Sequence, residues 1–198
     1  MNPPIPDFAA AAAAGKLRFV DQDIRNVQRL TRFPDAEPWW GTDAKWRFDD
    51  ASRIFGVSYA AESLEAAFAE TVIHEHAYYL SGTWFVPWER IEERWSVRYS
   101  HPAKLRLLDL TGVHLKRLGL NNDISSTNKY AFTQRLSRAV HEQLPEAQGI
   151  YYVSRQLNTQ CVIAVFERSG LRCCAHRIRL DRHPIFWKLV RKFNVAFT

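Results

Sequence analysis

The order of the expected strands and helices restricts this chain more than any other feature. Short apolar or alternating runs bounded by turn residues predict strands at 54–60, 94–99, 105–110, 149–153, 161–167 and 173–180. Helical spacing predicts helices at 62–79, 127–144 and 184–193. The two kinds of element do not alternate in a regular βαβ repeat, which argues against a doubly wound parallel sheet. The sequence therefore predicts an α+β fold.

The limits of these elements rest on a few local signals. The helix at 62–79 gathers Leu64, Ala67, Phe68, Thr71 and Val72 on one face. The helix at 127–144 is expected to be capped by Ser125 or Ser126 and to end before Pro145. The pair Ser169 and Gly170 predicts a hairpin between the last two strands.

Length and composition are those of one soluble domain. The chain has 198 residues, with 46% hydrophobic and 24% charged residues. Residues 1 to about 20 resemble an appendage, with three prolines before an alanine run at 9–14. That run has no basic start, so it is not expected to be a signal peptide, and no window approaches the ~20 apolar residues of a membrane span. We expect a cytoplasmic protein.

The three cysteines indicate neither a disulfide framework nor a zinc site. Their number is odd, and the positions Cys161, Cys173 and Cys174 give no CxxC spacing. We expect reduced thiols within strands, which also fits the cytoplasm.

Charge is distributed unevenly along the chain. The net charge is +6, which favours anionic partners such as phosphates, nucleic acid or acidic protein surfaces. Residues 54–89 nevertheless contain no Lys or Arg, while five glutamates fall in that window.

Glu70 has Ala66, Ala67, Ile73 and His74 as its helical neighbours, so its own helix offers no ion-pair partner. Glu70 is either a functional carboxylate or a carboxylate at the edge of the apolar helix face that pairs with an arginine from another segment.

Three further side chains are candidates for ligand contact. Arg47 lies in an aromatic loop at 32–50, and a guanidinium can grip phosphate in a planar, bidentate manner. Tyr59 ends the strand that leads into the Glu70 helix, and Ser154 follows the strand at 149–153. Taken alone, these residues are more typical of a surface arginine, a core tyrosine and a turn serine.

Several short motifs occur together in the order of a known family. The chain resembles the RES domain over roughly residues 24–169. The matching stretches are Val27–Leu30, Arg47–Asp50, Phe55–Tyr59, Ala66–Glu70, Leu107–Leu110, Gly149–Arg155 and Ala164–Glu167. On this basis residues 1–23 are an N-terminal extension, 24–169 the catalytic core, and 170–198 a strand and basic tail of the same domain. The chain departs from the family at Trp46, where a glycine often precedes the second arginine.

The resemblance implies a fold, a substrate and a partner. The fold would be an ADP-ribosyltransferase-like mixed β core with flanking helices. The substrate would be NAD, cleaved by hydrolysis or phosphorolysis or used to transfer ADP-ribose to a protein. Many members are toxins paired with an Xre-type antitoxin.

The resemblance also places Arg29, Arg47, Tyr59, Glu70 and Ser154 around the NAD. Glu70 would stabilise the charge that develops on the ribose, and the arginines would hold the pyrophosphate. Tyr59 would stack on or orient nicotinamide, and Ser154 would bind the ribose or a neighbouring side chain. No metal is expected.

Three other interpretations stay open at this stage. The basic, aromatic-containing segment at 168–192 could bind nucleic acid. Glu70, His74 and His76 could contribute to a metal site, although a further ligand at suitable spacing is not visible. The chain could also be a RES-like protein that only mediates interactions.

Overall fold

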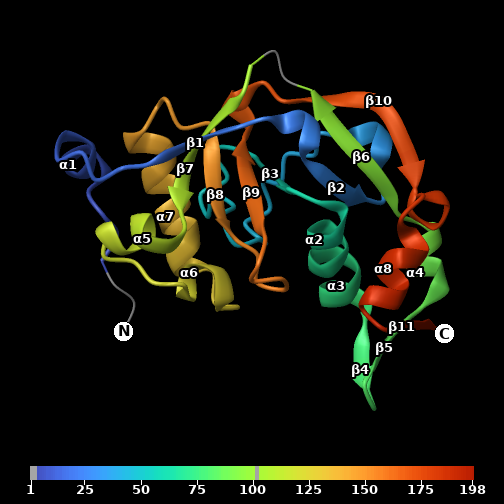
Figure 1. The fold of residues 1–198 in the computed structure, drawn as a ribbon. Coiled ribbons are helices and arrows are strands. Elements are labelled where there is room, and N and C mark those ends of the chain that lie inside the picture. The colour runs from blue at the N-terminus through green and yellow to red at the C-terminus, as the bar shows by residue number, and fades with distance from the viewer. Residues whose placement is uncertain (1–3, 101–102) are drawn as a thin grey trace.

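A large mixed sheet with helices packed against it forms the frame of the protein (Figure 1). The computed structural model describes residues 4–100 and 103–198. Within these residues an eight-stranded sheet has the order β1-β7-β8-β9-β3-β2-β6-β10, and a three-stranded sheet has the order β11-β5-β4. The pairs β7–β8 and β11–β5 are parallel, and the other neighbours are antiparallel. This arrangement confirms the predicted α+β class.

The strands are short, and those of the large sheet come from all parts of the chain. Their bounds are β1 (Phe19–Gln22), β2 (Gln28–Thr31), β3 (Val57–Ala61), β4 (Tyr78–Leu80), β5 (Thr83–Val86), β6 (Trp95–Ser100), β7 (Leu105–Leu110), β8 (Gly149–Val153), β9 (Cys161–Phe166), β10 (Arg172–Arg179) and β11 (Val195–Phe197). The six strands expected from the sequence are therefore present, with small shifts at their ends.

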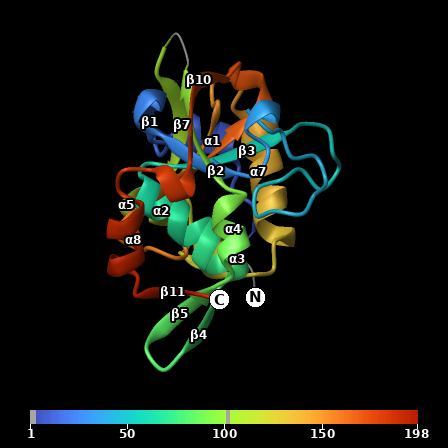
Figure 2. The same cartoon turned by 90° about the vertical axis from the view of Figure 1, so that its right-hand side faces the viewer.

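The helices form two groups beside the sheet (Figures 1 and 2). The α-helices are α1 (Phe8–Ala13), α2 (Leu64–Phe68), α3 (His74–His76), α4 (Trp88–Glu92), α5 (Gly112–Arg117), α6 (Asp123–Ser126), α7 (Ala131–Gln143) and α8 (Phe186–Lys192). A π-helical segment, η3 (Ala69–Ile73), joins α2 to α3, and short 3-10 turns are η1 (Ile24–Asn26), η2 (Pro34–Ala36), η4 (Glu167–Ser169) and η5 (Leu180–Arg182). In Figure 1, α5, α6 and α7 lie near β7, while α2, α3, α4 and α8 lie near the opposite half of the sheet.

The core lies on both faces of the sheet, and β9 runs through its middle. Val162, Ala164 and Phe166 face the larger cluster, which also contains the buried sides of α2, α7 and α8. Ile163 and Val165 face a smaller cluster on the other side. Alternate side chains of a strand point to opposite faces, so a strand buried on both sides appears as an unbroken apolar run.

The helix that carries Glu70 is shorter than expected and is interrupted. Ser63 caps it by accepting a hydrogen bond from the Ala66 N–H at 3.0 Å. The helical segment ends at His76, so the prediction that it reaches Tyr79 is wrong. Tyr78 and Tyr79 instead pair with β5, where they lie against Phe85 and Trp84. The cross-strand aromatic contacts explain why these residues leave the helix.

Two other local predictions are corrected by the structure. The helix expected at 127–144 starts at Ala131, and Ser125 and Ser126 belong to the separate helix α6 rather than capping it. The expected hairpin at Ser169 and Gly170 does not form. Both edges of β9 are already occupied by β8 and β3, so the chain turns through η4 and continues to β10, which pairs with β6.

The N-terminal extension packs onto the domain. Phe8 in α1 is fully buried, and its N–H donates a hydrogen bond to Oε1 of Gln143 at the end of α7, at 2.8 Å. Strand β1 then pairs with β7 and forms one edge of the sheet. The described part of this segment, residues 4–22, thus packs against the rest of the fold through α1 and β1.

The structure also bears on the cysteines and on membrane insertion. Cys161 is a free, partly buried thiol in β9. The side chains of Cys173 and Cys174 lie outside the described part of the structure. Among the described residues, none of the helices has the length and apolar character needed to cross a bilayer.

Candidate active site

The directions of three strands bring Glu70 and Ser154 to one edge of the sheet. Strands β3 and β8 both run antiparallel to β9, which lies between them, so β3 and β8 point the same way. The helix containing Glu70 starts just after β3, and Ser154 is the first residue after β8. Residues that are far apart in the sequence therefore meet where these two strands end.

Ser154 holds the Glu70 carboxylate directly. Its hydroxyl donates a hydrogen bond to Oε1 of Glu70 at 2.5 Å, and the Gln156 N–H donates to the same oxygen at 3.2 Å. The Ser154 hydroxyl in turn accepts from the Leu157 N–H at 3.0 Å, and only 1% of the serine is exposed. A short hydrogen bond to a carboxylate is strong, so the turn after β8 fixes the orientation of Glu70.

Glu70 lies in the π-helical segment and on the wall of a cavity. The segment Ala69–Ile73 contains one of the rare π turns, which occur often at functional sites. The cavity has a volume of about 440 Å³, within the range of small-molecule pockets, and Arg29, Arg47 and Tyr59 line it together with Glu70. Ser154 lies behind Glu70 and not on the cavity wall.

The cavity is predominantly cationic and has an aromatic rim. Three acidic side chains line it, those of Asp43, Glu70 and Glu75. The basic residues that line it are Arg29, Arg32, Lys45, Arg47, Arg94 and Arg155. Phe33, Trp39 and Trp46 also line it and are exposed, as expected for side chains that could stack against a flat ligand. An anionic molecule with flat rings fits this lining.

Arg47 is buried and held by the elements around it. Only 8% of it is exposed, its Nη1 donates to the carbonyl oxygen of Ile124 at 2.9 Å, and its guanidinium lies 5.0 Å from the ring centre of Tyr130. Gln134 of α7 fixes the same loop by donating to the carbonyls of Ala44 and Trp46. The loop at 32–50 is thus fixed around Arg47.

Tyr59 reaches the same loop with its hydroxyl. That hydroxyl donates to Oδ1 of Asp49 at 2.8 Å and accepts from the Phe48 N–H at 2.9 Å. Burial raises the pKa of Tyr59 well above its usual value, and the Asp49 charge acts in the same direction, so the phenol stays protonated. Tyr59 thus lines the cavity, and its hydroxyl anchors the residues next to Arg47.

Removing this hydroxyl tests whether it anchors the loop. Tyr59→Phe leaves Asp49 and the Phe48 N–H each short of one buried hydrogen bond, so we expect the free energy of unfolding to fall by about 1–3 kcal/mol. Urea denaturation measures this change. The control is Tyr151→Phe, which removes a hydroxyl that donates to Glu62 outside the cavity. Equal losses in the two variants would contradict a special role for Tyr59.

Arg29 is held by a buried acidic residue. Its Nη1 donates to the carbonyl oxygen of Tyr59 at 2.8 Å, and its Nε lies 2.9 Å from Oε1 of Glu37. Burial alone would lower the pKa of Arg29, but the neighbouring Tyr99 and Glu37 raise it. Arg29 therefore stays charged, although Glu37 offsets part of that charge.

Sequence reasoning did not single out Tyr152, which also lines the cavity. It is buried in β8, two residues before Ser154, and packs edge-on against Phe48 at 4.7 Å between ring centres. Burial raises the pKa of Tyr152, and the Glu70 charge raises it further. The strand period of two places Tyr152 and Ser154 on the same face, which was the available signal.

Comparison with known proteins decides the family. The family model described as the RES domain matches residues 25–188, most of the chain and more than the sequence motifs alone covered. This chain is a RES domain protein. Curated proteins offer no matching sequence.

The RES domain protein also resembles a solved structure. A chain in the crystal structure of the M. tuberculosis MbcT–MbcA toxin–antitoxin complex is similar, with a TM-score of 0.60 at 14% sequence identity. The similarity covers 88% of this chain and 93% of that chain. At this identity the comparison shows a shared fold.

The structure also addresses the competing interpretations. Residues 4–100 and 103–198 contain no group of three or more His, Cys, Asp or Glu side chains that could hold a metal ion. In the basic segment at 168–192, several cations have partners inside the protein. Arg168 donates to carbonyls at the end of α7, Arg177 pairs with Asp35, Arg179 with Asp181, and Lys192 with Glu65. The three ion pairs offset part of the positive charge that this segment offers to nucleic acid.

Proposed function

We propose that this RES domain protein cleaves the bond between nicotinamide and ribose in NAD. The observation that carries the proposal is a carboxylate, Glu70, which is fixed by Ser154 on the wall of a cationic cavity with an aromatic rim. A dinucleotide has two flat ring systems and a pyrophosphate, so it matches both kinds of lining. The resemblance to the RES family supports the choice of NAD among such molecules.

The chemistry requires stabilisation of positive charge. As the bond from the ribose carbon to the nicotinamide nitrogen breaks, the electron pair leaves with neutral nicotinamide and the sugar acquires oxocarbenium character. A preorganised carboxylate beside the ribose lowers the energy of that state. Water then adds to the sugar carbon and loses a proton, which gives ADP-ribose. Inorganic phosphate in place of water would give a phosphorylated ADP-ribose.

The other residues of the cavity bind and orient the dinucleotide. Arg29 and Arg47 hold the pyrophosphate by charge-assisted hydrogen bonds. The ring of Tyr59 packs against nicotinamide, while its hydroxyl keeps the loop of Arg47 in place. Ser154 acts through Glu70, so it is a positioning residue. The proposed reaction uses NAD as its substrate and uses no metal.

We also propose that the protein is a cytoplasmic toxin neutralised by an antitoxin of the Xre type. The fold shared with a chain of the MbcT–MbcA toxin–antitoxin complex supports this role. Depletion of cellular NAD would account for toxicity. Expression of the wild type should stop growth, and coexpression of an antitoxin should restore it.

Incubation of the purified protein with NAD tests the proposed activity. Nicotinamide release is followed with and without inorganic phosphate, and the products are identified by mass spectrometry. ADP-ribose indicates hydrolysis, a phosphorylated product indicates phosphorolysis, and ADP-ribose attached to protein indicates transfer. If no condition releases nicotinamide, the proposed function is wrong.

Removing the Ser154 hydroxyl tests whether Ser154 orients Glu70 or binds the substrate itself. We expect Ser154→Ala to lower kcat by about tenfold, the effect of losing one charge-assisted hydrogen bond, while KM changes little. The measurement is nicotinamide release at varied NAD concentration. Ser126→Ala, on the exposed end of α6, is the matched control. A rise in KM without a fall in kcat would mean that Ser154 binds the substrate itself.

A further inference from the structure

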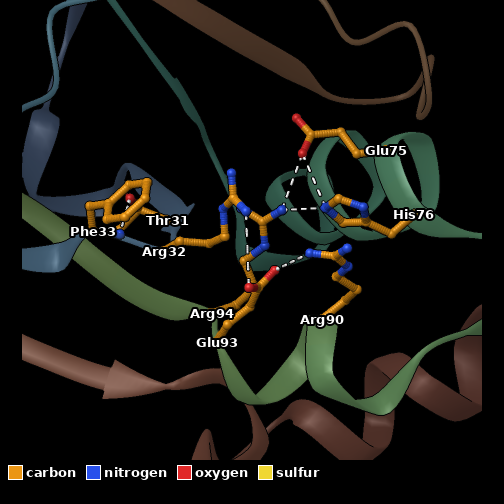
Figure 3. Close-up of polar contacts among 8 residues, drawn as sticks. All are labelled: Thr31, Arg32, Phe33, Glu75, His76, Arg90, Glu93 and Arg94. Carbon is orange, nitrogen blue, oxygen red and sulfur yellow. Dashed lines mark hydrogen bonds and ion pairs between the residues drawn. The ribbon is translucent and has the colours of Figure 1, made fainter.

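Two arginines face each other at the end of the β2–β6 pair, beside the cavity. The register pairs Thr31 of β2 with Trp95 of β6. Because the two strands are antiparallel, one further step along the pair places Arg32 opposite Arg94. Figure 3 shows the two side chains at this position. Like charges on directly opposed positions destabilise a sheet, so the arrangement calls for counter-charge.

Arg94 is almost completely buried at the side of the cavity, and one of its donors has no partner in the described part of the chain. Only 5% of it is exposed, and its Nη2 contacts Oε2 of Glu75 at 3.2 Å and the Nε2 of His76 (Figure 3). Its Nε is buried and has no hydrogen-bond partner among the described residues. A buried donor without a partner is costly, and Arg94 lines the cavity.

The acidic residues nearby offset only part of the positive charge. Glu93 lies 3.3 Å from Arg90 and 4.0 Å from Arg32, so it is shared between two cations. Glu75 lies 3.2 Å from Arg94, and its carboxylate is also 3.4 Å from the Nε2 of His76. Burial lowers the pKa of Arg94, and the charge of Arg32 acts in the same direction. Glu75 and Glu93 raise the pKa but do not fully compensate. Three guanidinium groups thus share two carboxylates.

His76 does not add a full positive charge to this cluster. Burial lowers the pKa of His76, and Arg94 lowers it further. A neutral imidazole can accept at Nε2 the hydrogen bond that Arg94 donates. The excess charge therefore resides on the arginines, and Arg32 and Arg94 are the ones that face the cavity.

We propose that Arg32 and Arg94 form a second anion subsite of the cavity, which takes a phosphate group other than the pyrophosphate held by Arg29 and Arg47. The identity of the dinucleotide rests on the proposed function. The phosphate group could be free inorganic phosphate or an additional monoester phosphate on the dinucleotide, since a pair of guanidinium groups recognises both. Arg94 would supply the buried donor and Arg32 the exposed one.

The test measures binding, so it does not depend on turnover. Isothermal titration calorimetry at constant ionic strength gives the affinity of the full-length protein for inorganic phosphate. NAD and NADP are compared in the Glu70→Gln background, where cleavage is slow. Arg32→Gln is the test variant, and Arg94→Lys, which keeps the charge but loses the planar fork, is the second. Arg90→Gln is the matched control, because Arg90 pairs with the same Glu93 but does not line the cavity.

Two results would support the subsite, and each shows where the bound phosphate group comes from. If the phosphate is free, Arg32→Gln weakens inorganic phosphate binding by about tenfold or more while Arg90→Gln leaves it within about twofold. If the phosphate belongs to the dinucleotide, NADP binds more tightly than NAD, and Arg32→Gln removes that preference. The subsite is overturned if both arginine variants give the same phosphate and NADP affinities as their parent. Phosphate binding without NAD binding would instead contradict the proposed function alone.

Discussion

Glu70→Gln is expected to lower kcat for nicotinamide release from NAD by about 10²–10³-fold, the usual effect of removing one preorganised charged group from a transition state. The amide has almost the same shape and can still accept the hydrogen bond that Ser154 donates to Glu70. The substitution therefore removes the negative charge with little change in packing. KM should change by much less than kcat, because the charge acts on the transition state.

The matched control lies on the same helix. Glu65→Gln removes a carboxylate that pairs with Lys192 and does not line the cavity, so activity should stay within about twofold of the wild type. Thermal unfolding of both variants should stay within about 4 °C of the wild type. Full activity in a folded Glu70→Gln protein would show that the carboxylate is not the group that stabilises the ribose.

The six expected strands were predictable because each is a short apolar or alternating run bounded by turn residues. The limits of β7 and β8 agree with the sequence expectation, since their apolar residues are flanked by polar or turn residues. Pairing was not predictable in the same way. The hairpin expected at Ser169 and Gly170 fails because the partners of β9 are β3 and β8, and no local signal reveals that both its edges are taken.

The candidate site was predictable where a residue type and a family motif agreed. The structure places Arg29, Arg47, Tyr59 and Glu70 around one cavity, with Ser154 behind Glu70. Their roles stay predictions. The π turn was not visible in the sequence, because nothing in the residues of η3 distinguishes a π turn from an ordinary α-helical turn.

Arg94 illustrates what sequence reasoning misses. It is the first residue of the strand predicted at 94–99 and was not singled out, yet it is buried beside Glu75. Its contact with the cavity depends on the register of β2 against β6, which joins segments more than sixty residues apart. The same register explains why Arg32 was not singled out.

Arg47→Gln is expected to lower kcat/KM for NAD by about 10²-fold, mainly through a higher KM. The guanidinium is buried, and its position is set by the Ile124 carbonyl and the Tyr130 ring, so the protein has already ordered it for an anion. Loss of a buried charge that meets a phosphate costs about 2–5 kcal/mol, which corresponds to this range of effect. Steady-state kinetics of nicotinamide release give the change.

Two further variants separate charge from geometry at this position. Arg47→Lys keeps the charge but loses the planar fork and the stacking on Tyr130, so its kcat/KM should fall between those of Arg47→Gln and the wild type. Arg135→Gln removes an exposed arginine of α7 outside the cavity and should change KM by less than about twofold. If Arg47→Gln and Arg135→Gln have equal KM values, Arg47 does not bind the pyrophosphate. A larger defect in kcat than in KM would assign Arg47 to the ribose end of the cavity, beside Glu70, because only groups at the reacting bond act mainly on the transition state.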